Sequence, residues 1–401
     1  MSFKTRVSVL LLSTPVLAFV LVGGLLGNNA AARTSGDDKF QQLRVFEDVV
    51  QLVMAAYVED VKVDKVMGGA MRGLADGLDP DSAYLTPEQV REVQAGTLPT
   101  GDVGLALTRQ FYLRVIAARD GSPAARAGLL TGDYIRAIDG KATRDLTVFE
   151  GTRLLRGEPG SKVVLTVIRG NAAEPHEITL VREKAQPPPL TSKMLEAGVG
   201  YIRIPAFTAS TPADVTRHAD QLARAGARAL IVDVRRTAEG RIDDGIATAR
   251  LFVKSGTLTA RAGRAAEGQA DTPKEPVVAN PGDGAIALPV QLLISAGTSG
   301  AAEVFAAALD GNNRADLIGE HTIGRAAAQK LVLIRENHGL WLTHARYLTP
   351  AGELIHGKGL KPDVAIDEPD VDFGVALPKS DPVLEAALEH AKKALLLVPG
   401  L

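Results

Sequence analysis

The chain has 401 residues, a length that predicts two or three domains rather than one. Hydrophobic residues make up 46% of the chain and charged residues 23%, which is the balance of a globular protein. The net charge of -2 argues against a nucleic-acid partner, and the lack of cysteine excludes disulfides and thiolate metal sites.

The N-terminal residues 1–34 have the pattern of an export signal. Lys4 and Arg6 precede an apolar run over about residues 7–26, and the small-residue sequence Asn-Asn-Ala-Ala-Ala follows at 28–32. This order is typical of a secretory signal peptide. Because the run approaches the roughly 20 residues that span a bilayer, an uncleaved membrane anchor is the alternative. Both interpretations predict an exported protein of the periplasm or cell envelope, held at the inner membrane if the anchor remains.

Residues 37–98 are predicted to form a helical N-terminal segment. Apolar residues recur at helical spacing in two stretches, and the second stretch predicts a helix over Val63–Leu78. The sequence Thr86-Pro87-Glu88 should begin another helix, because it offers a cap and a proline at the first helical position. The apolar positions of the first stretch are Phe46, Val49, Val50, Val53, Met54 and Tyr57.

Residues 100–185 are predicted to form a compact, β-rich domain. Short β-rich runs alternate there with Gly/Asp turns, and Asp139-Gly140 is typical of a tight hairpin. One helix is expected at about Leu146–Leu155. The expected strands are Leu113–Ala117, Tyr134–Ile138 and Val163–Ile168.

The stiff sequence Gln-Pro-Pro-Pro at 186–189 leads into the largest predicted domain, residues 188–380. Strands alternate with helices along it, which predicts an α/β layer and a multidomain α+β fold for the chain. Ala260–Ala285, rich in Ala, Gly, Pro and charge, is interpreted as a loop, and residues 381–401 as a C-terminal helix. The expected strands are Gly200–Ile204, Leu230–Val234, Val290–Ser295, Leu317–Ile318 and Leu331–Ile334, and the helices Pro212–Ala225, Ile242–Phe252 and Ala301–Leu309.

The sequence Val103-Gly104-Leu105-Ala106-Leu107 resembles the Gly-Leu-x-Leu loop of PDZ domains. In that family an extended peptide adds a strand to a sheet edge, and N–H groups of the loop hold its terminal carboxylate. The resemblance implies peptide binding at Gly104, Leu105, Ala106 and Leu107; the alternative is a groove that only docks its own chain. Further segments with the spacing of bacterial-type PDZ domains are Gly121–Ala124, Ala127–Leu129, Gly132–Ile135 and Ile138–Gly140.

With the PDZ pattern placed, the flanking segments resemble the carboxy-terminal processing, or tail-specific, serine peptidases of family S41. The resemblance covers roughly residues 40–390 and implies a Ser–Lys mechanism with an orienting glutamine and a backbone oxyanion turn. A serine hydroxyl needs an adjacent base that is neutral at the working pH before it attacks. The segments that agree in order and spacing are Leu78–Glu88, Gly200–Ile204, Leu230–Arg235, Ala345–Gly352 and Gly357–Val364.

The family's nucleophile and base fall on residues that lack this chemistry. The family sequence Gly-Ser-Ala-Ser-Ala-Ser-Glu falls on Gly297–Glu303, which places the nucleophile at Gly300. The base falls on Arg325, which stays protonated in proteins. The orienting glutamine falls on Gln329 and is retained.

The oxyanion turn departs from the family as well. The family's Asn-Pro-Gly-Gly falls on residues 237–240, where Glu239 precedes Gly240 and its carboxylate would repel an oxyanion. Three departures together predict a pseudoprotease. Ser299 is the alternative nucleophile, although its position before a helix predicts a capping role, and a neighbouring residue on a helix points about 100° elsewhere.

Three functions remain open from the sequence. The first is an exported binding protein that holds C-terminal or unfolded peptide tails, or that regulates an active homologous peptidase. The second is an active serine endopeptidase that processes C-termini with Ser299. The third is a scaffold whose N-terminal helices form a homo-oligomer. No cofactor is expected, and the seven histidines show no metal-ligand spacing.

Overall fold

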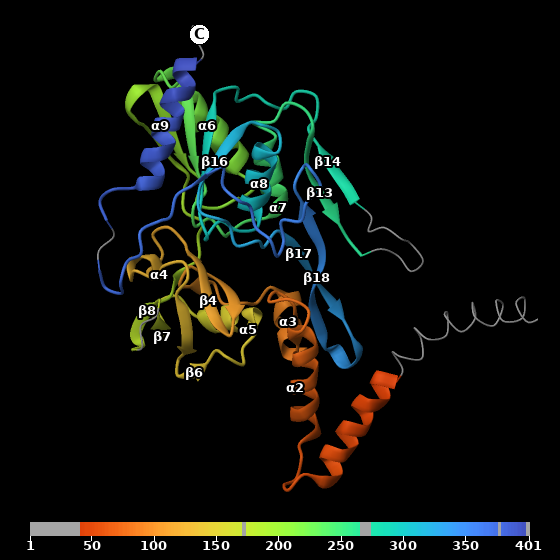
Figure 1. Ribbon diagram of the computed structural model, residues 1–401. Helices are drawn as coiled ribbons and strands as arrows, with labels where there is room; N and C mark the ends of the chain where they lie inside the picture. Colours follow the sequence, from red (N-terminus) through yellow and green to blue (C-terminus); the bar gives the residue numbers. More distant parts are fainter. Residues whose placement is uncertain (1–40, 171–173, 265–273, 376–377, 398–401) are drawn as a thin grey trace, which may run out of the picture. The chain divides into compact units, whose positions relative to one another are not determined.

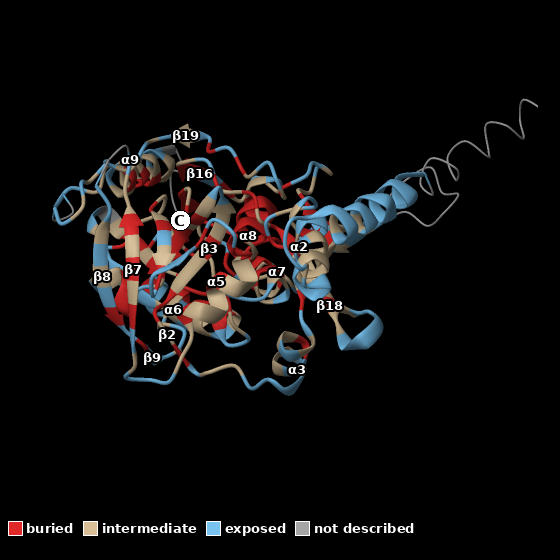
Figure 2. Cartoon of the chain, turned by 90° about the horizontal axis from the view of Figure 1, so that it is seen from below, coloured by how far each residue is buried: buried red, intermediate tan, exposed pale blue. Residues whose placement is uncertain are grey.

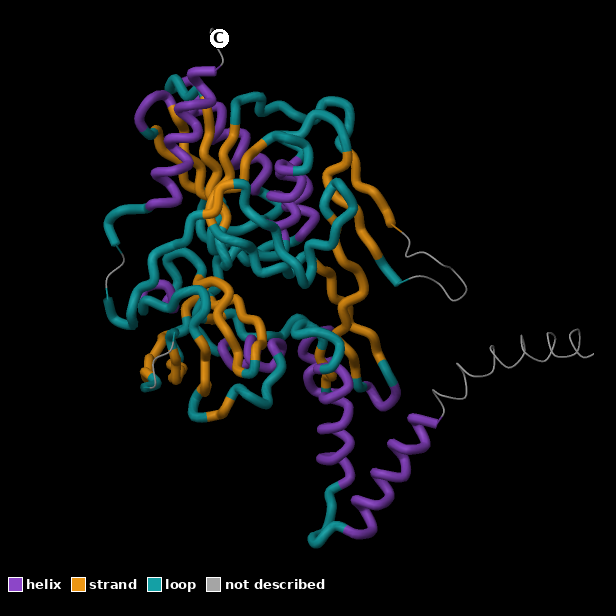
Figure 3. The backbone as a smooth tube through the Cα atoms, viewed as in Figure 1, coloured by secondary structure: helices purple, strands orange, loops and turns teal. Residues whose placement is uncertain are grey.

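The computed structural model describes residues 41–170, 174–264, 274–375 and 378–397, so the predicted export signal lies outside the described residues. The chain divides into two compact units between Met71 and Arg72. Helices and strands alternate in a mixed α+β architecture, which confirms the predicted fold class (Figures 1 and 3). Over the described ranges, no helix is both long and apolar enough to cross a membrane.

The predicted N-terminal helices are present. The first unit contains a helix over residues 41–56 and most of α2 (Val63–Asp76). In the second unit, β1 (Ala83–Leu85) precedes α3 (Pro87–Ala95), which begins at the predicted cap. The Thr86 hydroxyl accepts from the Gln89 N–H, and the Gln89 side chain accepts from the Thr86 N–H. This capping box fixes the start of α3.

The predicted PDZ domain is built on an antiparallel sheet with the order β3-β4-β5-β7-β8, in which β6 pairs with β5. The expected hairpin is confirmed, because Ile138 pairs with Lys141 and both turn residues have positive φ. Strand β3 lies at the sheet edge, and α5 (Val148–Leu155) packs beside it. The strands are β3 (Leu105–Gln110), β4 (Tyr112–Ala118), β5 (Tyr134–Ile138), β6 (Lys141–Ala142), β7 (Lys162–Ile168) and β8 (His176–Val181); β2 (Gly101–Asp102) pairs with β9 (Glu183–Lys184), and α4 spans Pro123–Arg126.

The α/β core contains a second sheet with the order β10-β11-β12-β15-β16-β19, parallel except at β10. All residues of β12 and β15 are buried, as expected for a parallel sheet covered on both faces. The strands are β10 (Thr191–Met194), β11 (Val199–Arg203), β12 (Ala229–Asp233), β15 (Val290–Ile294), β16 (Ala315–Gly319) and β19 (Val364–Ala365).

Helices cover the two faces of this sheet. Leu230 and Val232 of β12 join the core cluster to which α6 (Thr211–Arg224), α7 (Ile242–Ala249) and α8 (Ala301–Asp310) contribute. Ile231 belongs to a separate cluster with α9 (Pro382–Leu397). Alternate residues of one strand therefore face different helices, and Figure 2 shows this central region as buried.

A third sheet corrects the loop prediction for Ala260–Ala285. Strands β13 (Thr257–Ala262) and β14 (Lys274–Val278) pair antiparallel, while residues 265–273 lie outside the described ranges. The local composition predicted a loop because it carries no sign of the distant pairing that holds β13 to β18 (Gly339–Leu348). Strand β14 is an edge strand, which tolerates Pro276. The other strands of this sheet, β1 and β17 (Ala327–Leu333), both pair with β18.

Candidate functional site

Gly300, the predicted nucleophile position, is the N-cap residue of α8. Its φ of 62° lies in the left-handed region that favours glycine. A Cβ built on Gly300 would meet no atom within 4 Å, so there is room for a side chain at this helix N-terminus. The chain supplies none there, and position 300 therefore offers no nucleophile.

Ser299 does not cap α8, so that prediction was wrong. Its backbone N–H donates to the Thr237 carbonyl (3.0 Å), which holds the residue outside the helix. The cap comes instead from Glu303, whose Oε2 accepts from the Gly300 N–H (3.0 Å). Ser299 is only 5% exposed, and within the described ranges no hydrogen bond joins its hydroxyl to a basic side chain.

The fully buried Glu303 joins the predicted nucleophile segment to the predicted base segment. Besides the Gly300 N–H, its carboxylate accepts from the Thr322 hydroxyl (2.5 Å) and from the backbone N–H groups of Gly324 (2.6 Å) and Arg325 (2.7 Å). Burial raises the pKa of the Glu303 carboxyl, although these donors oppose the shift. The structure thus brings the backbones of Gly300 and Arg325 to one carboxylate.

The Arg325 side chain, at the predicted base position, is committed to other partners. Its Nε donates to Asp81 Oδ2 (3.1 Å), its Nη2 donates to Asp81 Oδ1, and its Nη1 donates to the Leu107 carbonyl (2.7 Å). Asp81 lies before β1, its side chain is only 6% exposed, and Leu107 lies on β3. A guanidinium paired on two nitrogens with a carboxylate has no lone pair with which to take a proton.

Gln329, the predicted orienting residue, lies on β17 and donates a side-chain hydrogen bond to β18. Its Nε2 donates to the Thr343 hydroxyl (3.4 Å). Gln329 and Arg325 nevertheless line the same cavity of about 200 Å³, together with Phe149 and Trp341. The structure therefore brings Gln329 and Arg325 to one cavity, but within the described residues it shows no hydrogen bond between them.

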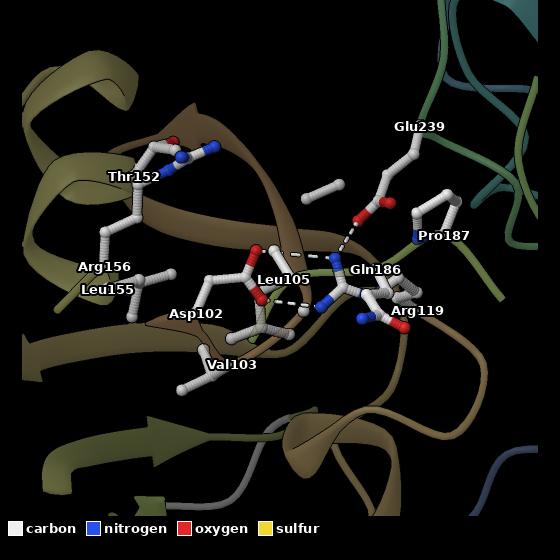
Figure 4. Close-up of a pocket in the computed structure, with 13 residues that line it drawn as sticks. Asp102, Val103, Leu105, Arg119, Thr152, Leu155, Arg156, Gln186, Pro187 and Glu239 are labelled. Carbon is white, nitrogen blue, oxygen red and sulfur yellow. Dashed lines mark hydrogen bonds and ion pairs between the residues drawn. The ribbon is translucent and has the colours of Figure 1, made fainter. Parts of the chain in front are cut away.

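The predicted oxyanion turn, residues 237–240, follows β12. Gly240 has a φ of 126°, and a Cβ there would approach the Phe207 carbonyl oxygen to 2.2 Å, so only glycine fits. The Glu239 side chain reaches Arg119, whose Nη1 donates to Oε1 at 3.0 Å (Figure 4). Burial raises the pKa of the Glu239 carboxyl, and Arg119 opposes the shift. A partly buried carboxyl group thus stands beside the turn that would have to stabilise an oxyanion.

The predicted peptide-binding residues Gly104, Leu105 and Ala106 line a cavity of about 320 Å³. Thr152, Leu155 and Arg156, at the C-terminal end of α5, line it as well, so the cavity lies between the edge strand β3 and this helix. The rest of the lining comes from Asp102, Val103, Arg119, Glu239 and residues 185–187 (Figure 4). The fourth predicted residue, Leu107, is bonded through its carbonyl to Arg325.

Known protein families match the chain in two places. A PDZ domain model matches residues 114–169, and the model of peptidase family S41 matches residues 198–366. A carboxy-terminal-processing protease of Bartonella bacilliformis is 30% identical over 336 residues, which cover 82% of this chain and 76% of the relative. The chain belongs to the S41 family of carboxy-terminal processing proteases. The resemblance noted in the sequence is therefore confirmed.

Other relatives agree with the S41 assignment. A carboxyl-terminal-processing protease of Synechocystis sp. is 33% identical over 321 residues, which cover 78% of this chain and 73% of the relative. The solved structure of a photosystem II D1 C-terminal processing protease matches with a TM-score of 0.67 and 27% identity, covering 80% of this chain and 92% of that one.

Sequence reasoning missed four residues of this candidate site: Asp81, Asp102, Arg119 and Glu303. Asp81 and Glu303 lie in segments that resemble the family, and this resemblance could have marked them as candidate site residues. Arg119 gave no signal, because its partner Glu239 lies 120 residues away in the chain. Asp102 enters the site by accepting a hydrogen bond from Arg119, and no signal in the sequence marked this residue either.

Proposed function

We propose that this chain is an exported, S41-family binding protein that holds C-terminal or unfolded peptide tails in its PDZ domain and no longer performs the Ser–Lys reaction. One observation carries the proposal. At the two predicted catalytic positions, Gly300 has no side chain and the guanidinium of Arg325 is paired with Asp81. Acyl transfer requires both a nucleophile and a group that accepts its proton.

Glu239 supports the loss of catalysis. The tetrahedral intermediate of peptide hydrolysis carries a negative oxygen, which the enzyme must meet with fixed hydrogen-bond donors. Glu239 instead places a carboxyl group at the turn, bonded to Arg119 (3.0 Å). When this carboxyl is ionised, it repels an oxyanion formed nearby.

The groove supports peptide binding. Strand β3 has no strand partner on its outer side within the described sheet, so its edge offers main-chain N–H and C=O groups to an extended peptide, apart from the Leu107 carbonyl, which accepts from Arg325. The cavity beside it has apolar walls from Val103, Leu105 and Leu155 and two cations, Arg119 and Arg156. This lining fits a tail that ends in an apolar residue with a free carboxylate.

The proposal is tested with a fluorescein-labelled glycine–serine peptide that ends in valine, made with a free carboxylate and as the C-terminal amide. Fluorescence anisotropy should show that the free acid binds the purified chain more tightly than the amide. Mass spectrometry after a long incubation should find both peptides intact. Equal or absent binding of the two forms would contradict the binding role, and cleaved peptide would contradict the loss of catalysis.

An oligomeric regulator is the second candidate. In the first unit, Leu43, Val49 and Leu52 of the helix over residues 41–56 are each more than half exposed. Apolar side chains exposed on one helix are a common feature of association surfaces. Light scattering should then give the mass of more than one chain, and Leu52→Glu should lower it; a monomeric parent chain would remove this candidate.

Export is proposed from the sequence of residues 1–34 alone. The expected result is that the mature body is recovered from the cell envelope or periplasm after fractionation, and that deletion of residues 2–26 leaves it in the cytoplasm. An unchanged distribution after the deletion would contradict the proposed signal.

A further inference from the structure

We propose that Glu239 occupies the carboxylate site of the empty peptide groove, and that a tail binds by displacing Glu239 from Arg119. The inference rests on the proposed function and deepens it. It assigns Arg119 as the cation that receives the terminal carboxylate of the tail, and it makes a residue of the S41 core the internal competitor.

The position of Arg119 supports this role. Its backbone N–H donates to the Gly104 carbonyl (2.8 Å), so Arg119 is attached directly to the glycine of the predicted carboxylate-binding loop. Its guanidinium faces the cavity between β3 and α5, as Figure 4 shows. The Arg119 side chain is only 9% exposed, and it lines this cavity.

Two carboxylates already share the Arg119 guanidinium, and they are held differently. Asp102 accepts from both terminal nitrogens, from Nη2 at 2.6 Å and from Nη1 at 3.4 Å. Glu239 accepts once, from Nη1 at 3.0 Å. The Glu239 side chain is 35% exposed and the Asp102 side chain 17% exposed. Glu239 is therefore the carboxylate that yields to an incoming one.

The charges around the cavity explain why Glu239 must yield. The charged side chains that line it are Asp102 on β2, Arg119 after β4, Arg156 at the end of α5, and Glu239 itself. Two cations and two carboxylates balance in the empty groove. A tail would bring a third carboxylate into a partly desolvated space, where like charges repel more strongly than in water. Moving Glu239 into solvent restores the balance.

The same geometry predicts a dependence on pH. Burial raises the pKa of the Glu239 carboxyl, and the neighbouring Asp102 adds to the rise while Arg119 opposes it. A carboxyl with a raised pKa takes up its proton first as the solution is acidified. The affinity for a free-carboxylate tail should therefore increase as the pH falls from 7 toward 5, and this increase should disappear in Glu239→Gln.

The experiment uses the full chain and the valine-ended peptide as free acid and as amide. Glu239→Gln should bind the free acid about tenfold more tightly than the parent chain, equivalent to about 1.4 kcal/mol, and should bind the amide with unchanged affinity. Glu239→Ala provides a second variant that also removes the hydrogen bond to Arg119. Glu275→Gln is the matched control, because Glu275 is a 72% exposed carboxylate of β14, and this change should leave both affinities unaltered.

Three results would overturn the inference. Equal free-acid affinity of Glu239→Gln and the parent chain would show that Glu239 does not compete, while the proposed binding function would stand. An equal gain for acid and amide would show that the change opens the groove in general rather than freeing a carboxylate site. Absence of binding by every variant would overturn both the inference and the proposed function.

Discussion

Arg325 joins three parts of the second unit through its guanidinium and its backbone N–H. It contacts Asp81 before β1 and Leu107 on β3, while its own backbone is bonded to Glu303 of α8. A lysine at this position has one nitrogen and cannot reproduce the paired contact with both Asp81 oxygens. At the predicted base position, Arg325 therefore acts as a structural tie between these segments.

Arg325→Ala should lower the free energy of unfolding by about 3 kcal/mol, because it leaves the buried Asp81 carboxylate without its partner. Urea unfolding followed by circular dichroism measures the loss. Arg241→Ala is the control, since Arg241 and Asp243 form a pair whose side chains are 78% and 72% exposed, and it should cost about 0–1 kcal/mol. Similar losses of unfolding free energy in the two variants would show that the Arg325–Asp81 pair does not stabilise the fold.

Gly300 and Gly240 both have positive φ, but they differ in the space around them. Gly300→Ser should cost about 1–3 kcal/mol of unfolding free energy, because the backbone is strained while the side chain has open space. Gly240→Ala should cost more, because its Cβ would also approach the Phe207 carbonyl oxygen to 2.2 Å. The same urea measurement compares the two variants, and an equal or reversed order of their losses would contradict this difference in the space around the two glycines.

At the scale of secondary-structure elements, α9 is anchored to the core sheet through its first residues. Asp381 Oδ1 accepts from the Leu384 N–H (3.0 Å), and the carboxylate also accepts from Arg235, at 2.9 Å to Oδ1 and 2.7 Å to Oδ2. Arg235 pairs in turn with the buried Asp233 at the end of β12. This chain of charges links the start of α9 to the carboxyl end of a central strand.

Asp381→Ala should weaken the docking of α9, because it removes both the cap and the ion pair. Hydrogen exchange of the α9 amides should speed up roughly fivefold or more, which corresponds to the loss of about 1 kcal/mol for the cap alone. Glu389→Gln is the control, since this carboxylate lies on the exposed side of α9 and should leave exchange unchanged. Equal exchange in the two variants would contradict the anchoring role.

The same carboxylates predict a loss of stability in acid. Burial alone would raise the pKa of Asp233 and of Asp381, but Arg235 holds both below their ordinary values. A carboxyl with a lowered pKa stabilises the fold above its unfolded value of about 4, and this stabilisation is lost as the pH falls through the folded pKa. Between pH 5 and pH 2, the free energy of unfolding measured in urea should fall less for Asp381→Ala than for the parent chain. An equal fall in the two proteins would contradict this.

Local sequence patterns predicted most elements but not those held by distant pairing. Thr86 and Pro87 predicted the start of α3, because capping needs only residues within one turn. Strands β13 and β14 were missed, because β13 is stabilised by β18, which lies more than 75 positions along the chain. Likewise, Ser299 had the right residue type for a cap, but the preceding turn bonds it to Thr237 and leaves the cap to Glu303.

At the scale of the whole second unit, two of the three departures from the S41 pattern contact the PDZ domain. Glu239 bonds to Arg119, and Arg325 bonds to the Leu107 carbonyl on β3. The sequence predicted that these positions had lost their catalytic residue types, but it could not predict their new partners, which lie 120 and 218 residues away. Two of the predicted catalytic positions are thus bonded to residues of the PDZ domain.

The central claim is that this S41 protein binds tails without cleaving them, and the digestion of casein tests it most directly. The samples are the parent chain, Ser299→Ala, and the double variant Gly300→Ser/Arg325→Lys. The account predicts that the parent chain and Ser299→Ala leave casein intact, and any cleavage by the double variant would locate the lost chemistry at residues 300 and 325. Cleavage by the parent chain that disappears in Ser299→Ala would contradict the account and identify Ser299 as a working nucleophile.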